Sequence, residues 1–372
     1  MNLRKSITIG LALLIVVLLT LLGIRWLNNN SKPDISASLL KGLSNRGDQE
    51  NNALHMLAGS MLTDQGLVVA EIQKGKAANY YLLESMGLLL EYAVLCDNSN
   101  SVKQLLTIID KYYYTSGDFY AWRIKQDEDD FPPEQATALV DDLRLIEGLS
   151  QAQTRGLGNY NRYFGRISDS IYRYETVNGP FVDYYDARMK EPAHRLSLFY
   201  INISALEALA ASDERWKKPN QAARILLRNS PVNSEGFFPA WYDYQSKDYK
   251  YPQQINMVEN LYSSINYSLA GGNAQAFAGF LKRELDQGAI YTRYYLDGTP
   301  ASRDQSAAVY ALAARFLDNM GQREDAALCM EIMLSFQINK YGILLGAFGD
   351  LNSLTVHSFD QLECLITLRR GE

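Results

Sequence analysis

The chain has 372 residues, with 36 Lys or Arg against 42 Asp or Glu, and its formal charge of −6 is mild and spread along the sequence. Nucleic-acid binding is therefore disfavoured, because it requires a basic patch. The three cysteines and three histidines are scattered. This spacing predicts neither a disulfide framework nor a metal site nor a Ser/His/Asp triad, and no motif implies a cofactor.

The N-terminus carries an apolar segment at residues 7–24 that is long enough to cross a bilayer as a helix. Arg4 and Lys5 precede it, and basic residues favour the cytoplasmic side. A cleaved signal peptide is the alternative, although no small-x-small cleavage site follows the apolar segment, and no cysteine lies near enough for lipid attachment. We expect a single-pass protein of the cell membrane, with the lipid bilayer as a partner: a cytoplasmic tail at residues 1–6, a transmembrane signal anchor at 7–24, a linker at 25–35 and an extracellular domain at 36–372.

Most of the extracellular part has apolar residues at helical spacing, which predicts an all-α domain of about twelve helices. The clearest candidates are residues 80–95, 102–113, 133–152, 196–211, 255–269, 274–285, 306–317 and 323–337, with weaker candidates at 36–42, 50–62, 159–174, 217–227 and 358–368. Helices that come in pairs can close into a toroid of hairpins, and an open helical array is also compatible with this periodicity.

Two segments interrupt the helical pattern and predict short strands at one end of the helices. Residues 66–73 are rich in β-branched and apolar side chains, and residues 174–185 have Asn178-Gly179, a good hairpin turn, between β-prone flanks.

Glu84 is the most informative single residue. It stands at the start of the helical segment 80–95 among apolar neighbours. Desolvation disfavours the charged form of a carboxyl group, and a carboxyl that keeps its proton near neutral pH can serve as a general acid. A first-turn Glu can also simply complement the helix dipole.

The order of motifs around Glu84 resembles glycoside hydrolase family 8, the cellulase and chitosanase group. That family has a short Gly-Arg-Val-Ile-Asp-like strand, then Ser-Glu-Gly-x-x-Tyr-Gly-Met, an apolar helix ending in Asp, and an aromatic residue before Ala-Trp. This chain has Gly66-Leu67-Val68-Val69, Leu83-Glu84-Ser85-Met86-Gly87, Tyr92 to Asp97, and Phe119-Tyr120-Ala121-Trp122. The resemblance implies a barrel of six helical hairpins, an (α/α)6 toroid with a few short strands, preceded here by one transmembrane helix.

The resemblance also implies further site residues. Residues 136–152 are similar to the family's Asp-x-Asp-x-x-Ile-Ala-Tyr-Ala-Leu helix, and Asp142 falls on its second aspartate, which suggests a role in orienting the sugar. The family's late Tyr-Asp-Ala-x-Arg motif supplies the catalytic base, but the local counterpart is Tyr262-Ser263-Ser264-Ile265-Asn266, and a serine cannot act as that base. We expect Asp243, in an aromatic loop, to replace it, with Asp183 and Asp186 as rivals.

Each of these aspartates also has a structural interpretation. Asp142 is equally compatible with an ordinary exposed helix residue beside Asp141, and Asp243 with a loop or capping residue. Among the many aromatic residues, Trp122 is expected to stack on a sugar because it occupies the family's Ala-Trp position, and Trp241, Tyr242 and Tyr244 are further candidates.

The expected function is that of a membrane-anchored, extracellular O-glycosyl hydrolase, an endo-acting enzyme that cleaves a β-linked polysaccharide of an exopolysaccharide or biofilm matrix with inversion. An inverting mechanism needs an acid and a base about 6.5–9.5 Å apart. An exopolysaccharide synthase complex is a further candidate partner. Two alternatives stay open: a non-catalytic glycan-binding subunit of a polysaccharide synthesis or export system, and a polysaccharide lyase.

Overall fold

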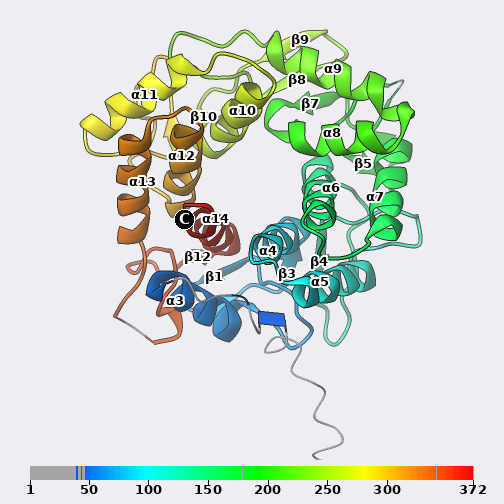
Figure 1. The fold of residues 1–372 in the computed structure, drawn as a ribbon, viewed down its shortest axis with the longest axis horizontal. Coiled ribbons are helices and arrows are strands. Elements are labelled where there is room, and N and C mark those ends of the chain that lie inside the picture. Colours follow the sequence, from blue (N-terminus) through cyan, green and yellow to red (C-terminus); the bar gives the residue numbers. More distant parts are fainter. Residues whose placement is uncertain (1–38, 41–42, 44–46, 178, 341, 372) are drawn as a thin grey trace, which may run out of the picture.

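The computed structural model describes residues 39–40, 43, 47–177, 179–340 and 342–371. Within these residues, twelve α-helices alternate along the chain between an outer and an inner position around one axis (Figure 1). The inner helices are α4 (Leu83–Leu95), α6 (Leu139–Thr154), α8 (Ile203–Ser212), α10 (Met257–Leu269), α12 (Ala307–Asn319) and α14 (Ser358–Arg370). The outer helices are α3 (Asp48–Met56), α5 (Ser99–Tyr112), α7 (Asn161–Tyr174), α9 (Lys217–Arg228), α11 (Gln275–Asp286) and α13 (Arg323–Ser335).

The two kinds of helix differ in how much of their surface is apolar. In α4 the consecutive residues Leu88, Leu89 and Leu90 are all buried, which requires neighbours on more than one side of the helix. In α9 the buried residues Pro219, Ala223 and Leu227 form one stripe at four-residue spacing. The inner helices are therefore enclosed by the ring, whereas an outer helix covers it with a single face.

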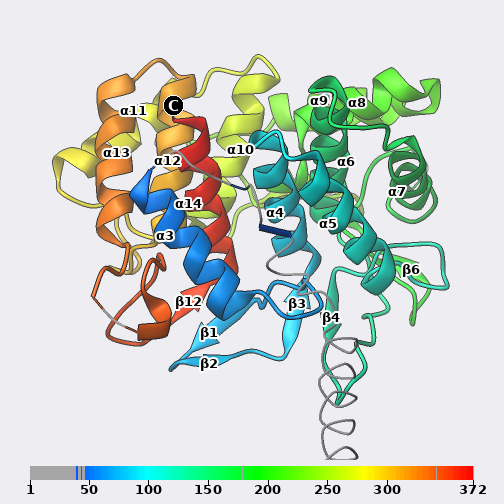
Figure 2. The ribbon, with the colours of Figure 1, turned by 60° about the horizontal axis from the view of Figure 1, so that its bottom comes forward.

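The ring closes where α14 packs against α4, so that the end of the described chain meets its beginning (Figure 2). Small residues permit this close approach: the hydroxyl groups of Ser85 and Ser358, in the first turns of the two helices, are 2.8 Å apart. Ser85 stands where the family has glycine, and the hydroxyl group is buried in this helix contact. Between α6 and α10 the ring is bridged by the short 3-10 helix η2 (Leu198–Tyr200), which contacts both.

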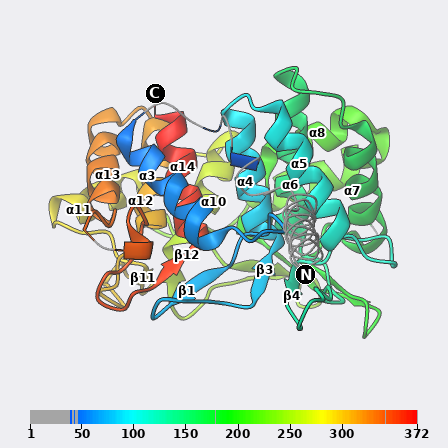
Figure 3. The same ribbon diagram turned by 90° about the horizontal axis from the view of Figure 1, so that it is seen from below.

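Short strands gather at one end of the ring, which we call the strand face (Figure 3). Four of them lead into first turns of inner helices: β3 into α4, β7 through η2 into α8, β10 into α10 and β12 into α14. The strands are β1 (Glu71–Gln73), β2 (Lys76–Ala77), β3 (Tyr80–Leu82), β4 (Arg123–Lys125), β5 (Tyr185–Asp186), β6 (Glu191–Pro192), β7 (Arg195–Ser197), β8 (Trp241–Asp243), β9 (Asp248–Lys250), β10 (Ile255–Asn256), β11 (Arg293–Tyr294) and β12 (Val356–His357). The other connections are the π-helix η1 (Leu57–Met61) and the 3-10 helices η3 (Glu214–Trp216) and η4 (Gly342–Leu344).

The predicted mostly helical fold with a few short strands is confirmed, and so is the antiparallel turn within residues 174–185, where Thr176 pairs with Phe181. Helices α4, α6 and α8 begin well after the predicted positions, at Leu83, Leu139 and Ile203. Residues 80–82 pair with β4, residues 133–138 are extended, and residues 196–197 pair with β8 before α8 starts. The helical spacing of apolar residues extends a few residues beyond the start of each helix. In these segments, pairing with other strands at the end of the ring outweighs that local pattern.

The predicted anchor at residues 7–24, its flanking segments and most of the candidate helix at 36–42 lie outside the described residues. Among the residues that the structure does describe, none of the helices is both long and apolar enough to span a bilayer.

Candidate active site

Glu84 lies at the strand face, in the first turn of the inner helix α4. The strand pair β3–β4 positions it, because Leu82 pairs with Arg123 and the N–H of Leu83 donates to the carbonyl of Trp122 at 2.9 Å. Trp122 is half-buried beside it. The acid and the aromatic residue predicted from separate motifs are thus brought together by one pair of strands.

Two carboxyl groups share one arginine at this place. Nη1 of Arg144 is 3.8 Å from Oε1 of Glu84 and 3.2 Å from Oδ1 of Asp141. Burial raises the pKa of Glu84, which the charge of Arg144 partly opposes, and Glu84 keeps 29% of its side chain exposed. Burial, together with the charge of Glu84, raises the pKa of Asp141 to about 8. The pair therefore retains a proton near neutral pH, as an acid catalyst requires.

A glycine makes room for Arg144. A Cβ on Gly87 would lie 3.1 Å from Cδ of Arg144, so the missing side chain lets the arginine lie flat against α4. Arg144 reaches Asp141 from one turn along α6. The contact of Arg144 with Glu84 joins two helices and depends on how they pack, so no local pattern in the sequence predicts it.

Asp142 faces the other way. It is fully buried and interacts with Glu175, the residue after α7, which is also fully buried. The four oxygen atoms of the two carboxyl groups are buried, and no neighbouring group in the described structure donates a well-formed hydrogen bond to them. Two carboxylates cannot bond to each other unless one holds a proton. Burial raises the pKa of Asp142, and it raises that of Glu175 to about 8. Asp141, rather than the predicted Asp142, is the aspartate that shares Arg144 with Glu84, and the charge of Glu84 contributes to its raised pKa.

Asp243 ends β8 and is partly exposed. Its Oδ1 accepts bonds from the backbone N–H groups of Gln245 and Ser246, at 3.0 and 2.8 Å, and these bonds lower its pKa. Asp186 has the same arrangement, accepting from Arg188 and Met189. Both are capping residues of turns.

Asp183, the other rival for the base, is 2% exposed and has its bonds satisfied within the protein. It accepts from the N–H and hydroxyl groups of Ser197, at 2.6 and 2.8 Å, and from Nε of Arg195 at 2.9 Å. The Arg195 guanidinium lies 5.0 Å from the ring centre of Trp241. Asp183 therefore holds an arginine and a tryptophan at the strand face, where water has little access to the carboxylate itself.

Glu259 was missed by sequence analysis. It lies half-buried in the first turn of α10, where Nδ2 of Asn256 donates to it at 3.2 Å. Burial raises its pKa, and the charges of Arg293 and Arg195 oppose this. Asn256 followed by Glu259 is a helix-start pattern, N-x-x-E, that could have been found had the start of α10 been placed at Asn256. Ser263 lies one turn farther along α10 and is buried. Its hydroxyl group donates a hydrogen bond to the carbonyl of Glu259.

The predicted aromatic residues separate into two groups. Trp122 and Trp241 are half-buried at the strand face, each under an arginine side chain. Tyr242 and Tyr244 instead pack against one another, with ring centres 5.4 Å apart, and the Tyr244 hydroxyl group donates to the carbonyl of Phe181. These two tyrosines stabilise the β8–β9 hairpin.

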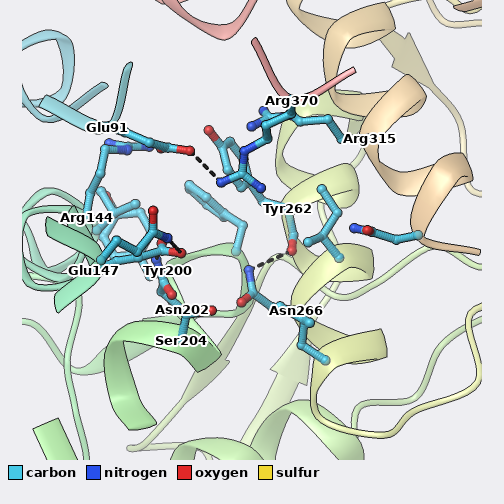
Figure 4. Close-up of a pocket in the computed structure, with 16 residues that line it drawn as sticks. Glu91, Arg144, Glu147, Tyr200, Asn202, Ser204, Tyr262, Asn266, Arg315 and Arg370 are labelled. Carbon is cyan, nitrogen blue, oxygen red and sulfur yellow. Dashed lines mark hydrogen bonds and ion pairs between the residues drawn. The ribbon is translucent and has the colours of Figure 1, made fainter. Parts of the chain in front are cut away.

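A polar pocket of about 290 Å³ lies inside the ring (Figure 4). We call it the axial pocket. It is lined by Arg144 but not by Glu84. All six inner helices contribute to its wall, which contains Glu91, Val140, Arg144, Glu147, Gln151, Phe199, Tyr200, Asn202, Ser204, Tyr262, Ile265, Asn266, Leu269, Arg315, Asn319 and Arg370. Within the described part of the chain, no cluster of three or more His, Cys, Asp or Glu side chains could hold a metal ion.

Comparison with known proteins places this geometry in a known fold. No protein-family model matches the sequence. The chain is 26% identical to the Bacillus subtilis protein named "Putative lipoprotein YdaJ", over 92% of this chain and 90% of that one. Among solved structures, an α-amylase from Clostridium perfringens superposes with a TM-score of 0.79 and 20% identity, covering 88% of this chain and 100% of that one.

The endoglucanase Cel10 of Klebsiella pneumoniae, a family 8 glycosyl hydrolase, superposes with a TM-score of 0.62 and 13% identity, covering 86% of this chain and 98% of that one. A D-mannose isomerase shares the same fold, with a TM-score of 0.64 and 10% identity over 92% of this chain, so the fold alone does not specify hydrolysis. The resemblance to family 8 is thus confirmed at the level of the fold, and this chain is a distant, family 8-like (α/α)6 barrel.

Proposed function

We propose that this protein is a glycoside hydrolase that acts on a polysaccharide at its strand face, with Glu84 as the general acid. The observation that carries the proposal is the Glu84–Arg144–Asp141 cluster, in which two desolvated carboxyl groups share one arginine. Burial favours the protonated form of both carboxyl groups, and Glu84, the more exposed of the two, is the member that can reach a substrate. Asp141 takes the sugar-orienting role that the sequence assigns to Asp142.

Glu259 is our candidate for the base of an inverting mechanism. It is one turn from Tyr262 on α10, and Tyr262 lines the same pocket as Arg144. Helix α10 is opposite α4 in the ring (Figure 1), and Glu259 and Glu84 each lie in the first turn of their helix, at the strand face. A base must reach water, and Glu259 is half-buried, whereas Asp183 is almost fully enclosed. Inversion requires such a pair across the sugar ring.

The half-buried tryptophan rings at the strand face, with arginine side chains beside them, suit a sugar substrate. The carbonyl of Trp122 accepts from the N–H of Leu83, the residue before Glu84, and Trp241 lies under Arg195. Flat aromatic faces stack on pyranose rings, and charged groups beside them bond to hydroxyl groups. The finer part of the proposal is a β-linked polysaccharide, as the family 8 resemblance implies; the amylase with the same fold makes an α-linked glucan the comparison to include.

The cellular setting is proposed from the N-terminus. The apolar segment at residues 7–24 would anchor the enzyme in the membrane with its barrel outside, and the similarity to a protein named as a lipoprotein supports membrane association. The first cysteine is Cys96, so a transmembrane helix rather than a lipidated cysteine would form the anchor. Alkaline extraction of membranes should leave the full chain in the pellet; release into the wash would favour cleavage of the segment.

The test of the function measures new reducing ends after incubation with β-glucan, xylan, a glucosamine-type polymer and starch. The wild type and the exposed control Glu331→Gln should release them from one class, and Glu84→Gln should lose at least about 100-fold of the rate. NMR of the fresh product should show the inverted anomer. Binding without release by the wild type would instead support the non-catalytic alternative, and a product absorbing in the near ultraviolet would identify a lyase.

A further inference from the structure

The axial pocket opens on the face opposite to the strands. Leu269, Asn319 and Arg370, which line it, are the last residues of α10, α12 and α14, and all three are exposed. On α4 the lining residue is Glu91, seven residues and about 10 Å along the helix from Glu84. The pocket therefore has a mouth at these helix ends, while its inner wall extends to Arg144, the partner of Glu84.

The wall of the axial pocket contains both hydrogen-bond donors and acceptors. Arg370 pairs with Glu91 at 2.8 Å, and Asn202 donates to Glu147 at 2.7 Å. The aromatic pair Phe199 and Tyr200 adds flat apolar surface, with ring centres 4.7 Å apart and planes at 87°. In Figure 4 the labelled polar side chains converge on one space from several inner helices.

This composition selects among ligand classes. The carboxylates of Glu91 and Glu147 disfavour an anion, while the guanidinium groups of Arg144, Arg315 and Arg370 disfavour a cation. An apolar ligand would leave these buried polar groups without water or partners. A neutral polyhydroxylated molecule can bond to both kinds of group and stack on the aromatic rings.

The size of the pocket limits the ligand further. A volume of about 290 Å³ is at the lower end of the range of about 300–1,000 Å³ that is typical of small-molecule sites. We propose that the axial pocket is a second carbohydrate-binding site, which takes a neutral mono- or disaccharide from the face opposite to the strands. This site does not depend on hydrolysis at Glu84.

Calorimetric titration of the detergent-solubilised full chain tests the proposal. Glucose, mannose, xylose, cellobiose and maltose serve as probes, and Glu84→Gln is the background, so that no probe is consumed. We expect saturable 1:1 binding of at least one sugar. Glu147→Gln and Arg370→Gln should each weaken it about tenfold or more, since hydrogen bonds to charged groups are lost, whereas Glu331→Gln on the outer helix α13 should not.

Two results would overturn the proposal: no saturable binding of any probe, or binding that both pocket variants leave unchanged. Strict competition between the bound sugar and the polymer would also overturn it, because the sugar would then occupy the strand face. Melting curves guard against misfolding. Arg370 is at an exposed helix end, where a substitution should not unfold the protein. Arg370→Gln therefore still tests sugar binding in the pocket if Glu147→Gln unfolds the protein.

Discussion

Arg144 on α6 reaches across to Glu84 on α4, with Nη1 3.8 Å from Oε1, while the same nitrogen lies 3.2 Å from Asp141. Burial raises the pKa of both carboxyl groups, and the charge of this one arginine lowers both. The strength of the proposed acid depends on this arginine, because a closer positive charge favours ionisation.

Replacing Arg144 by Gln should raise the pKa of both carboxyl groups. The alkaline limb of the pH profile of kcat/KM, which reports the acid, should move to higher pH by about 1–3 units. The maximal rate should fall, because the pair loses its orientation. Hydrolysis rates from pH 4 to 10 provide the measurement, with Arg162→Gln on the exposed side of α7 as control. An unchanged limb would show that Arg144 does not set the pKa of the acid.

Two matched substitutions, each replacing a carboxylate by its amide, can distinguish Glu259 from Asp243 as the catalytic base. Glu259→Gln should lower kcat by at least about 100-fold, because general-base assistance is lost. Asp243→Asn should keep most of the activity, because its carboxylate caps its own turn. Asp183→Asn is expected to raise KM through loss of the Arg195 position. The opposite ranking of the first two variants would return the base role to Asp243.

The buried pair Asp142 and Glu175 should make stability depend on pH. The pKa of Glu175 is raised from 4.5 to about 8, so the native state holds a proton that the unfolded state releases. The stabilising contribution of this proton to the free energy of unfolding is therefore fully present below about pH 4.5 and is lost as the pH rises towards 8. One such proton changes the free energy of unfolding by about 1.4 kcal/mol per pH unit.

Asp142→Asn replaces the shared proton with an amide N–H that can donate to Glu175. Urea denaturation at pH 5, 6.5 and 8 should show that the free energy of unfolding depends less on pH in the variant. The variant should therefore become more stable relative to the wild type as the pH rises. Parallel curves for the two proteins would mean that the pair does not share a proton.

Two helix glycines should respond oppositely to alanine. At Gly87 the added Cβ would press on Arg144, so Gly87→Ala should destabilise the protein by about 1–3 kcal/mol and disturb the pH profile. At Gly165 on α7 no atom lies within 4 Å of the added Cβ. Gly165→Ala should therefore stabilise by about 0.4–1 kcal/mol without changing activity. Thermal denaturation and the rate assay together check both; equal effects at the two positions would refute the proposed role for Gly87.

Periodicity along the chain was sufficient to predict the helices and their order, because apolar spacing is a local property of each segment. The position of Glu84 beside Trp122 also followed from sequence, since both belong to short motifs that one strand pair joins. The family resemblance supplied the closed ring, which periodicity alone left undecided.

The tertiary structure decided which carboxylates meet. Asp141 and Asp142 are neighbours that differ by about 100° around α6, and only the packing of α6 against α4, α7 and α8 determines which of them turns towards Glu84. We propose Glu259 for the site because strand pairing ends at Asn256 and places Glu259 in the first turn of α10, whereas Oδ1 of Asp243 is used by the β8–β9 turn. Local patterns determine the helices, whereas the rotation and depth of each helix, and hence its chemistry, depend on contacts between segments far apart in sequence.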